Sequence, residues 1–286
     1  MSYLTQEQIE LYHENGFLCI RNYLVQSEVS EMRSQIERIV ADFDMEEVSI
    51  FSTVEQTKTS DTYFIDSGDK VRCFFEEDAF DSNGTLKGKK EMSINKVGHA
   101  LHDLDPEFQK ISYKQEMMDM TTELGMQSPM IVQSQYIFKQ PHIGGKVVAH
   151  QDSTFIYTDP LSCVGFWMAL EDATIENGCL MAIPGSHRKG IGTRRFVRSR
   201  DGQSTTFIGK ENQWDLSSMV PIEAKSGTLV LLHGSCVHMS LENRSNHTRH
   251  AYILHAVDGR AIWPASNWLQ RPSDHPFRHL NQVINA

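Results

Sequence analysis

The second half of the chain consists of short apolar runs separated by turn-forming residues, and this pattern limits the folds open to it. Residues 130–139 alternate partly with period two, while 164–170 and the apolar run inside 224–234 are too short for typical helices. Further strands are expected at 147–148, 155–157 and 251–256. Short strands at this close spacing, punctuated by glycine, proline and asparagine, predict a jelly roll or a barrel.

The N-terminal residues predict two helices with a strand between them. Thr5 and Gln8 form a capping box for a helix that ends near Gly16, and 17–20 is a short apolar strand. Ser27 is expected to cap the second helix. Apolar residues follow it at helical spacing, namely Met32, Ile36, Ile39, Val40 and Phe43. An N-terminal helical layer is therefore expected.

The stretch between this layer and the strand series is less regular. Residues 45–95 are polar and mixed, and Asn83-Gly84 and Gly88 favour a loop or hairpin. Insertions of this length often serve as lids. A helix-rich stretch is expected over 97–124, interrupted by Pro106.

Length and composition indicate one domain. A chain of 286 residues with 40% hydrophobic residues can bury a full core, and barrels of this size commonly form a single domain. We expect one domain over 1–286, with a helical and lid-like part over about 1–125 and the β core over about 129–270.

Charge and cysteine content exclude several classes of protein. The net charge of −10 argues against a general nucleic-acid binder. Five scattered cysteines without a C-x-x-C pair indicate reduced thiols, and neither a disulfide framework nor a zinc site. No apolar run is long enough to span a membrane, and 283–286 is not a peroxisomal address. The cytosol is the default expectation, and the oligomeric state is not indicated.

A histidine and carboxylate pattern points to a metal. His150 and Asp152 form the only His-x-Asp/Glu triplet, and His238 lies 88 residues after His150. Since chance alone gives about one or two such triplets, the triplet needs support from its context. Two imidazoles and one carboxylate are the facial triad that binds non-haem Fe(II) and leaves positions open. The competing histidines are His142, His187, His233 and His255.

The residues after His238 favour it over its competitors. Ser240 follows two residues later and Arg249 eleven residues later. A guanidinium can hold the far carboxylate of a keto acid through two hydrogen bonds. Arg249 lies at the entrance of the strand at 251–256, so we expect it and His238 on neighbouring strands of one sheet. For His233 and His255 we expect strand-end rings bonded to backbone carbonyls.

Several segments spread over nearly the whole chain carry a resemblance to a known family. They are 15–18, 93–96, 136–142 with Gly145, 150–152, 171–180, 183–187, 238–249 and 263–269. In these segments the sequence resembles the phytanoyl-CoA dioxygenase family, most closely its domain-containing branch. The predicted metal and Arg residues fall where that family has its iron and 2-oxoglutarate residues.

This resemblance implies a mainly β protein with flanking helices, a double-stranded β-helix (jelly roll, cupin-like). It implies that His150, Asp152 and His238 bind Fe(2+). It also implies O2 and 2-oxoglutarate as co-substrates, and ascorbate as an optional reductant. The residues implied to contact 2-oxoglutarate are Lys96, Gln135, Trp167, Ser240 and Arg249. The branch can carry Met where this chain has Gln135. Without the resemblance, Lys96 would be interpreted as a solvated residue at a helix start, and Trp167 as core.

The family implies 2-hydroxylation of a fatty acyl-CoA such as phytanoyl-CoA, with release of succinate and CO2. By the same analogy, the peroxisome is a second candidate compartment. Another small molecule or a protein stays open as the substrate. Asp152 argues against a halogenase, which needs that position for halide, and the complete ligand set with Arg249 argues against a non-catalytic binding module. Six Arg and Lys residues within 188–200 form either a solvated face or a site for the phosphates of coenzyme A.

Overall fold

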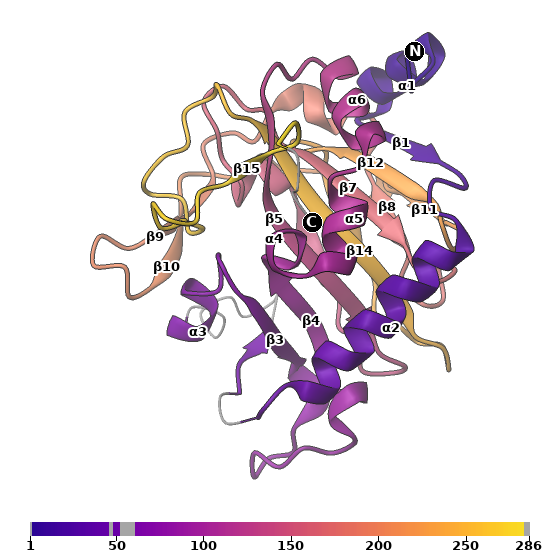
Figure 1. The fold of residues 1–286 in the computed structure, drawn as a ribbon, viewed down its shortest axis with the longest axis vertical. Coiled ribbons are helices and arrows are strands. Elements are labelled where there is room, and N and C mark those ends of the chain that lie inside the picture. Colours follow the sequence, from indigo (N-terminus) through magenta and orange to yellow (C-terminus); the bar gives the residue numbers. More distant parts are fainter. Residues whose placement is uncertain (1, 46–47, 52–60, 283–286) are drawn as a thin grey trace.

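A computed structural model describes residues 2–45, 48–51 and 61–282, and two sheets packed against each other form its centre (Figure 1). The large sheet is antiparallel except for one parallel pair, β2 with β3. Its strands, in spatial order, are β1 (Phe17–Ile20), β12 (Leu229–His233), β7 (Val164–Ala169), β14 (Arg249–Asp258), β5 (Pro129–Lys139), β4 (Ile94–His99), β3 (Val71–Glu76) and β2 (Ile50–Phe51), with β15 (Arg278–His279) also beside β5.

The small sheet and a hairpin complete the β structure. The strands of the small sheet are, in spatial order, β11 (Val220–Ile222), β8 (Leu180–Ala182), β13 (His238–Ser240) and β6 (Val147–His150). The hairpin pairs β9 (Arg195–Arg198) with β10 (Thr205–Ile208) and projects from the side of the sheets in Figure 1. Two sheets with this inner packing form the predicted jelly roll, and the predicted fold class is confirmed.

Period-two alternation gives the large sheet two different faces. In β7, Phe166 and Met168 pack into the cluster that includes the helices, whereas Trp167 and Ala169 pack against residues of the small sheet. The same alternation continues in β12 and β14. One face of the large sheet is therefore a helix-covered core, and the other is the inside of the jelly roll.

Helices cover the outer face, as the sequence predicted (Figure 1). They are α1 (Gln6–Asn15), α2 (Gln26–Asp42), α4 (Leu101–Leu104), α5 (Pro106–Ser112) and α6 (Gln115–Glu123). The short helix α3 (Thr62–Ile65) packs instead in a separate cluster with Phe74 and Trp268, next to the cavity described below. The predicted apolar face of α2 is buried or packed against the core. Its N-cap is Val25 and not Ser27, because the Glu28 carboxylate accepts a hydrogen bond from the Val25 amide.

The first helix ends where a glycine is required. The capping box of Thr5 and Gln8 is present, and Gly16 closes α1 with φ +80°. A Cβ on Gly16 would lie 2.4 Å from Nδ1 of His187. Side chains larger than hydrogen are therefore excluded here by both backbone conformation and space.

Two sequence predictions about local structure are wrong, and a third is met by one of its two alternatives. Residues 97–99 belong to strand β4, so the helix-rich stretch starts only at Leu101. A loop or hairpin was expected in 45–95, and β3 and β4 form an antiparallel pair there, with β2 and α3 before it; residues 46–47 and 52–60 lie outside the described residues. Asn83-Gly84 does turn the chain between Phe80 and Leu86, which form an isolated bridge. Residues 155–157 form no strand, because a 3-10 turn over Asp152–Thr154 precedes them.

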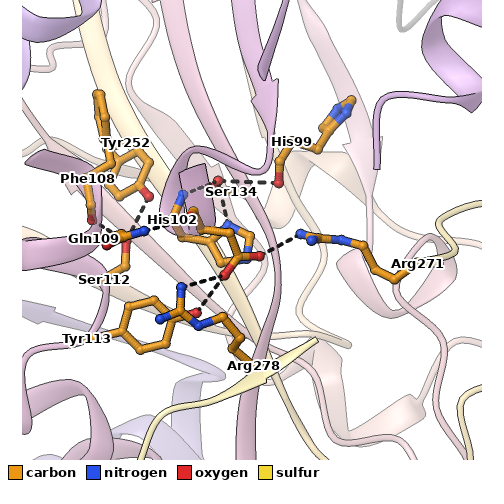
Figure 2. Close-up of polar contacts among 11 residues, drawn as sticks. His99, His102, Phe108, Gln109, Ser112, Tyr113, Ser134, Tyr252, Arg271 and Arg278 are labelled. Carbon is orange, nitrogen blue, oxygen red and sulfur yellow. Dashed lines mark hydrogen bonds and ion pairs between the residues drawn. The ribbon is translucent and has the colours of Figure 1, made fainter. Parts of the chain in front are cut away.

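A buried ion cluster fastens the C-terminal segment to the helical layer (Figure 2). Asp103 in α4 lies 2.9 Å from the Arg271 guanidinium and 3.4 Å from that of Arg278, and it accepts a hydrogen bond from Tyr113. Burial favours the neutral acid, but His102 and Arg271 hold the pKa of Asp103 below its usual range. The cluster orients the segment that carries Trp268, whose ring reaches the cavity described below.

Two further findings concern the cysteines and the helices of the described residues. All five cysteines lie there, and none is paired. None of the helices in this part of the chain is both long and apolar enough to cross a bilayer.

Candidate metal centre and co-substrate pocket

Strand pairing in the small sheet brings the predicted metal ligands together. β13 pairs with β6 so that His238 lies opposite His150, with 4.2 Å between the ring centroids. Asp152 lies two residues after His150 and begins a 3-10 turn that directs its carboxylate back toward both rings. One ligand atom from each residue lies within 4.8 Å of the others, and no other described cluster of histidine, cysteine or acidic residues meets this criterion.

Backbone carbonyls orient both histidine rings. Nδ1 of His150 lies 2.9 Å from the carbonyl of Val148, and Nδ1 of His238 lies 3.0 Å from that of Cys236. A carbonyl only accepts, so each Nδ1 carries the proton and each Nε2 presents a lone pair. The two Nε2 atoms face Oδ1 of Asp152 at 3.5 and 3.6 Å. Three electron-pair donors thus point at a common centre, as a bound cation requires.

The other carboxylate oxygen of Asp152 faces a residue of the opposite sheet. His255 in β14 places its Nε2 3.4 Å from Oδ2. Burial opposes ionisation of Asp152, but the imidazoles of His238, His255 and His150 around it hold its pKa well below the usual range. Gly165 leaves room for Oδ2, since a Cβ there would lie 3.1 Å away.

The carbonyl partners predicted for two other histidines are wrong. His255 faces the carboxylate of Asp152, because inward alternation from Arg249 places it on the cavity face. His233 accepts a hydrogen bond at Nδ1 from the Ser235 amide, in the tight turn that follows β12.

Arg249 lies in the same cavity as the metal ligands but on the other sheet. β14 belongs to the large sheet and β13 to the small one, so the prediction that His238 and Arg249 share a sheet is wrong. The chain crosses between the two sheets after Ser240. Arg249 and His238 consequently face each other across the inside of the jelly roll, where both line one cavity.

The Arg249 guanidinium is buried and mostly unpartnered. It is 2% exposed, and NH2 donates to the Gly178 carbonyl at 3.1 Å. Nε and NH1 have no hydrogen-bond partner among the described residues. Burial lowers the pKa of Arg249 to about 10. A buried cation with free donors is costly unless an anion pairs with it, so this position fits a carboxylate ligand.

The other predicted residues line the same cavity. Trp167 is next to Arg249, with 5.5 Å between the guanidinium carbon and the ring centroid, and Ser240 is nearby at the end of β13. Lys96 lies in β4, buried, and its ammonium donates to Oε1 of Gln135 at 3.3 Å. The interpretation of Lys96 as a solvated helix-start residue is therefore wrong.

All eight predicted site residues line this cavity, which measures about 1240 Å³ with its open mouth included. Its outer wall is aromatic, and the sequence did not reveal this wall. The aromatic residues and the two missed histidines come from distant segments: Phe51, Phe64, His99, Phe155, Phe196, Trp268 and His255. For His255 alone there was a usable signal, since it lies six residues after Arg249 and therefore on the same strand face.

Most of the basic residues in 188–200 have partners inside the chain. Arg188 donates to the Glu14 carbonyl, and Arg198 to that of Ile65. Arg194 lies 3.4 Å from Glu211, and the Arg195 guanidinium lies over the Tyr157 ring. The segment nevertheless borders the cavity, because its strand β9 contributes Phe196 to the wall.

A jelly roll with two histidines and one carboxylate facing a common centre defines the class of non-haem iron oxygenases. The family model for phytanoyl-CoA dioxygenase (PhyH) matches residues 12–251. The chain belongs to the phytanoyl-CoA dioxygenase family and is an oxygenase.

Among relatives, the chain is 46% identical to a phytanoyl-CoA dioxygenase of Arabidopsis thaliana, with 94% of each chain covered. It is 44% identical to phytanoyl-CoA dioxygenase domain-containing protein 1 of Rattus norvegicus, with 98% of this chain and 99% of the relative covered.

Similar solved structures include the non-heme alpha ketoglutarate dependent carbocyclase SnoK from nogalamycin biosynthesis (TM-score 0.62, 21% identity, 93% of this chain and 89% of that chain covered). Another is EctD from S. alaskensis with 2-oxoglutarate and 5-hydroxyectoine (TM-score 0.64, 17% identity, 95% and 83% covered). At these identities, the two structures support the fold alone.

Proposed function

We propose that the protein is an Fe(II)- and 2-oxoglutarate-dependent dioxygenase in which His150, Asp152 and His238 bind the metal. The observation that carries this proposal is the orientation of the two imidazoles. Each is fixed by a backbone carbonyl at Nδ1, so the Nε2 lone pairs face Asp152 before any metal binds. A two-histidine, one-carboxylate set on a cavity wall suits Fe(II) and leaves positions for co-substrate and O2.

Iron and 2-oxoglutarate, when bound, supply the oxidation of a substrate C–H bond by O2, with succinate and CO2 as the other products. The protein's own residues position the reactants and keep water away. His255 holds Oδ2 of Asp152, which leaves Oδ1 directed at the metal position. The aromatic wall places the substrate against this centre in an apolar environment, where fixed polar groups act most strongly.

For the co-substrate, Arg249 is the anchor of the far carboxylate. Nε and Nη1 have no partner among the described residues and Nη2 makes one hydrogen bond, so the guanidinium keeps donors for a carboxylate. Trp167 and Ser240 border the same end of the cavity. In the large sheet, Gln135 lies on β5, beside β14, and Lys96 lies on β4, beside β5. Burial lowers the pKa of Lys96 well below its ordinary value, so an added carboxylate would stabilise its charged form.

An anaerobic titration tests this proposal. Fe(II) should bind to the metal-free protein, and 2-oxoglutarate should then produce the visible charge-transfer band of a chelated keto acid. On admission of O2, succinate should accumulate. Binding of Fe(II) without any effect of 2-oxoglutarate would contradict the co-substrate assignment, and absence of Fe(II) binding would contradict the whole proposal.

For the prime substrate we propose a fatty acyl-CoA hydroxylated at carbon 2, with phytanoyl-CoA as the first candidate and fatty-acid metabolism as the setting. Support comes from the name of the Arabidopsis relative and from the apolar aromatic wall of the cavity. The basic segment 188–200 borders that wall and could pair with the phosphates of coenzyme A. A panel of acyl-CoAs, free acids and unrelated small molecules, scored by succinate release, distinguishes this class from the alternatives.

The charge of Arg194 and Arg195 gives a specific prediction. The double variant Arg194→Glu with Arg195→Glu should weaken binding of phytanoyl-CoA several-fold, and the wild-type affinity should fall with added salt, because exposed charges are screened within about 10 Å at 0.1 M. Succinate formation without substrate should not change. The matched control is Arg21→Glu with Arg38→Glu, two exposed arginines outside the cavity lining. Equal acyl-CoA affinity in both double variants would remove the basic segment from the site.

A further inference from the structure

Three residues that line the cavity have buried polar atoms without a hydrogen-bond partner among the described residues: Arg249, His255 and His99. The donors of Arg249 match the far carboxylate of the co-substrate. His255 is engaged with Asp152 through its other nitrogen. His99 has no part in either task, although its ring is completely buried and its Nε2 is unpartnered.

The hydrogen bonds of Ser67 fix the tautomer of His99. The Ser67 hydroxyl lies 2.5 Å from the Phe64 carbonyl and 2.7 Å from Nδ1 of His99. The carbonyl cannot donate, so the single hydroxyl proton lies between Ser67 and Phe64. The Ser67 oxygen therefore accepts from Nδ1, which must carry the ring proton of His99. Nε2 is left as a bare acceptor.

The surroundings of His99 keep the imidazole neutral, and aromatic rings border it. The ring packs edge-on to Phe64 and Trp268, at centroid distances of 5.6 and 5.2 Å. The ring points away from the ion cluster around Asp103 (Figure 2). On that side, the backbone carbonyl of His99 accepts a hydrogen bond from Ser134. Burial, followed by the charges of Lys96 and Arg271, lowers the pKa of His99 well below its ordinary value.

We propose that His99 is a specificity residue that accepts, at Nε2, a hydrogen bond from an O–H or N–H group of the prime substrate. The inference rests on the proposed function and deepens it. A buried acceptor without a donor costs about 1–3 kcal/mol, so a substrate that supplies the donor is favoured over one that does not. The preferred substrate then offers an O–H or N–H donor beside its apolar part, and in an acyl-CoA these donors are the amides and hydroxyl groups of the coenzyme A arm.

Small aromatic probes test this inference without knowledge of the substrate. Phenol and toluene have similar size, but only phenol can donate. Their dissociation constants are measured by NMR titration of the wild-type protein and of His99→Phe, which keeps an aromatic ring and removes Nε2. The ratio of the toluene constant to the phenol constant should be about fivefold higher in the wild type, the equivalent of one net hydrogen bond. An equal ratio in both proteins, or no binding of either probe, would overturn the proposal.

Ser67→Ala provides a second and independent variant if His99→Phe does not fold. It retains Nε2 but removes the acceptor that keeps the proton on Nδ1, so the preference for phenol should also fall. Nitrogen-15 spectra of labelled histidine should show the proton of His99 on Nδ1 in the wild type, and a proton on Nε2 there would also overturn the inference. Because these measurements use metal-free protein, they can fail while Fe(II) and 2-oxoglutarate still bind, which separates this inference from the proposed function.

Discussion

Replacement of any one of His150, Asp152 and His238 by alanine should reduce 2-oxoglutarate turnover by on the order of a hundredfold or more, since even the outer partners of metal ligands typically contribute 10- to 100-fold. Each residue supplies one of three atoms within 4.8 Å of one another, and no fourth described side chain can replace it. The measurements are succinate release and anaerobic Fe(II) binding. The urea midpoint should stay close to that of the wild type or rise, because removal of Asp152 also removes a buried carboxylate.

His233→Ala is the matched control for these variants. His233 precedes His238 by five residues and is half-buried, but its Nδ1 is bonded to the Ser235 amide and its ring lies outside the cavity. This variant should bind Fe(II) and turn over 2-oxoglutarate like the wild type. If His233→Ala abolished iron binding while His238→Ala did not, the assignment of the third ligand would be wrong.

The ligand residues could be identified from the sequence because they are close together along it or lie at a strand start. His150 and Asp152 are two residues apart, and His238 begins the strand that pairs with β6. The relation of His238 to Arg249 could not be derived in the same way. Eleven residues suffice either for a hairpin within one sheet or for a crossing to the opposite sheet, and nothing in 241–248 distinguishes the two routes.

Two of the strands in the polar stretch, β3 and β4, were missed because buried polar residues interrupt their alternation. β4 directs Lys96 into the cavity, and β3 buries Glu76, whose pKa burial raises to about 7. A charged residue at an inward-facing position breaks the alternation of apolar and polar residues, so the sequence of such a strand resembles that of a loop. Locally inconsistent sequence is expected where a site requires buried charge. At 155–157 the error was the opposite one, because an apolar run was interpreted as a strand where none exists. Phe155 is apolar because it packs against Phe196 in the cavity wall.

Substitution of Arg249 by lysine should raise the KM for 2-oxoglutarate by about 10- to 100-fold, with a smaller change in kcat. Lysine keeps the charge but cannot make two parallel hydrogen bonds to a carboxylate, and a hydrogen bond to a charged group contributes about 1.5–3 kcal/mol. Steady-state succinate formation over a range of 2-oxoglutarate concentrations measures this directly. The matched control is Arg271→Lys, because Arg271 is also buried but is paired with Asp103 outside the cavity.

Arg271→Lys should lower the urea midpoint and leave the KM for 2-oxoglutarate unchanged, which separates loss of an anchor from general loss of packing. The size of the Arg249→Lys effect then decides between two cations. An increase in KM well below tenfold, about 1.4 kcal/mol, would show that Arg249 is not the main carboxylate anchor. Lys96 would then take that role, since within the described residues its ammonium has only the Gln135 amide oxygen and aromatic faces as partners. In that case Lys96→Met should produce the large increase in KM that Arg249→Lys did not.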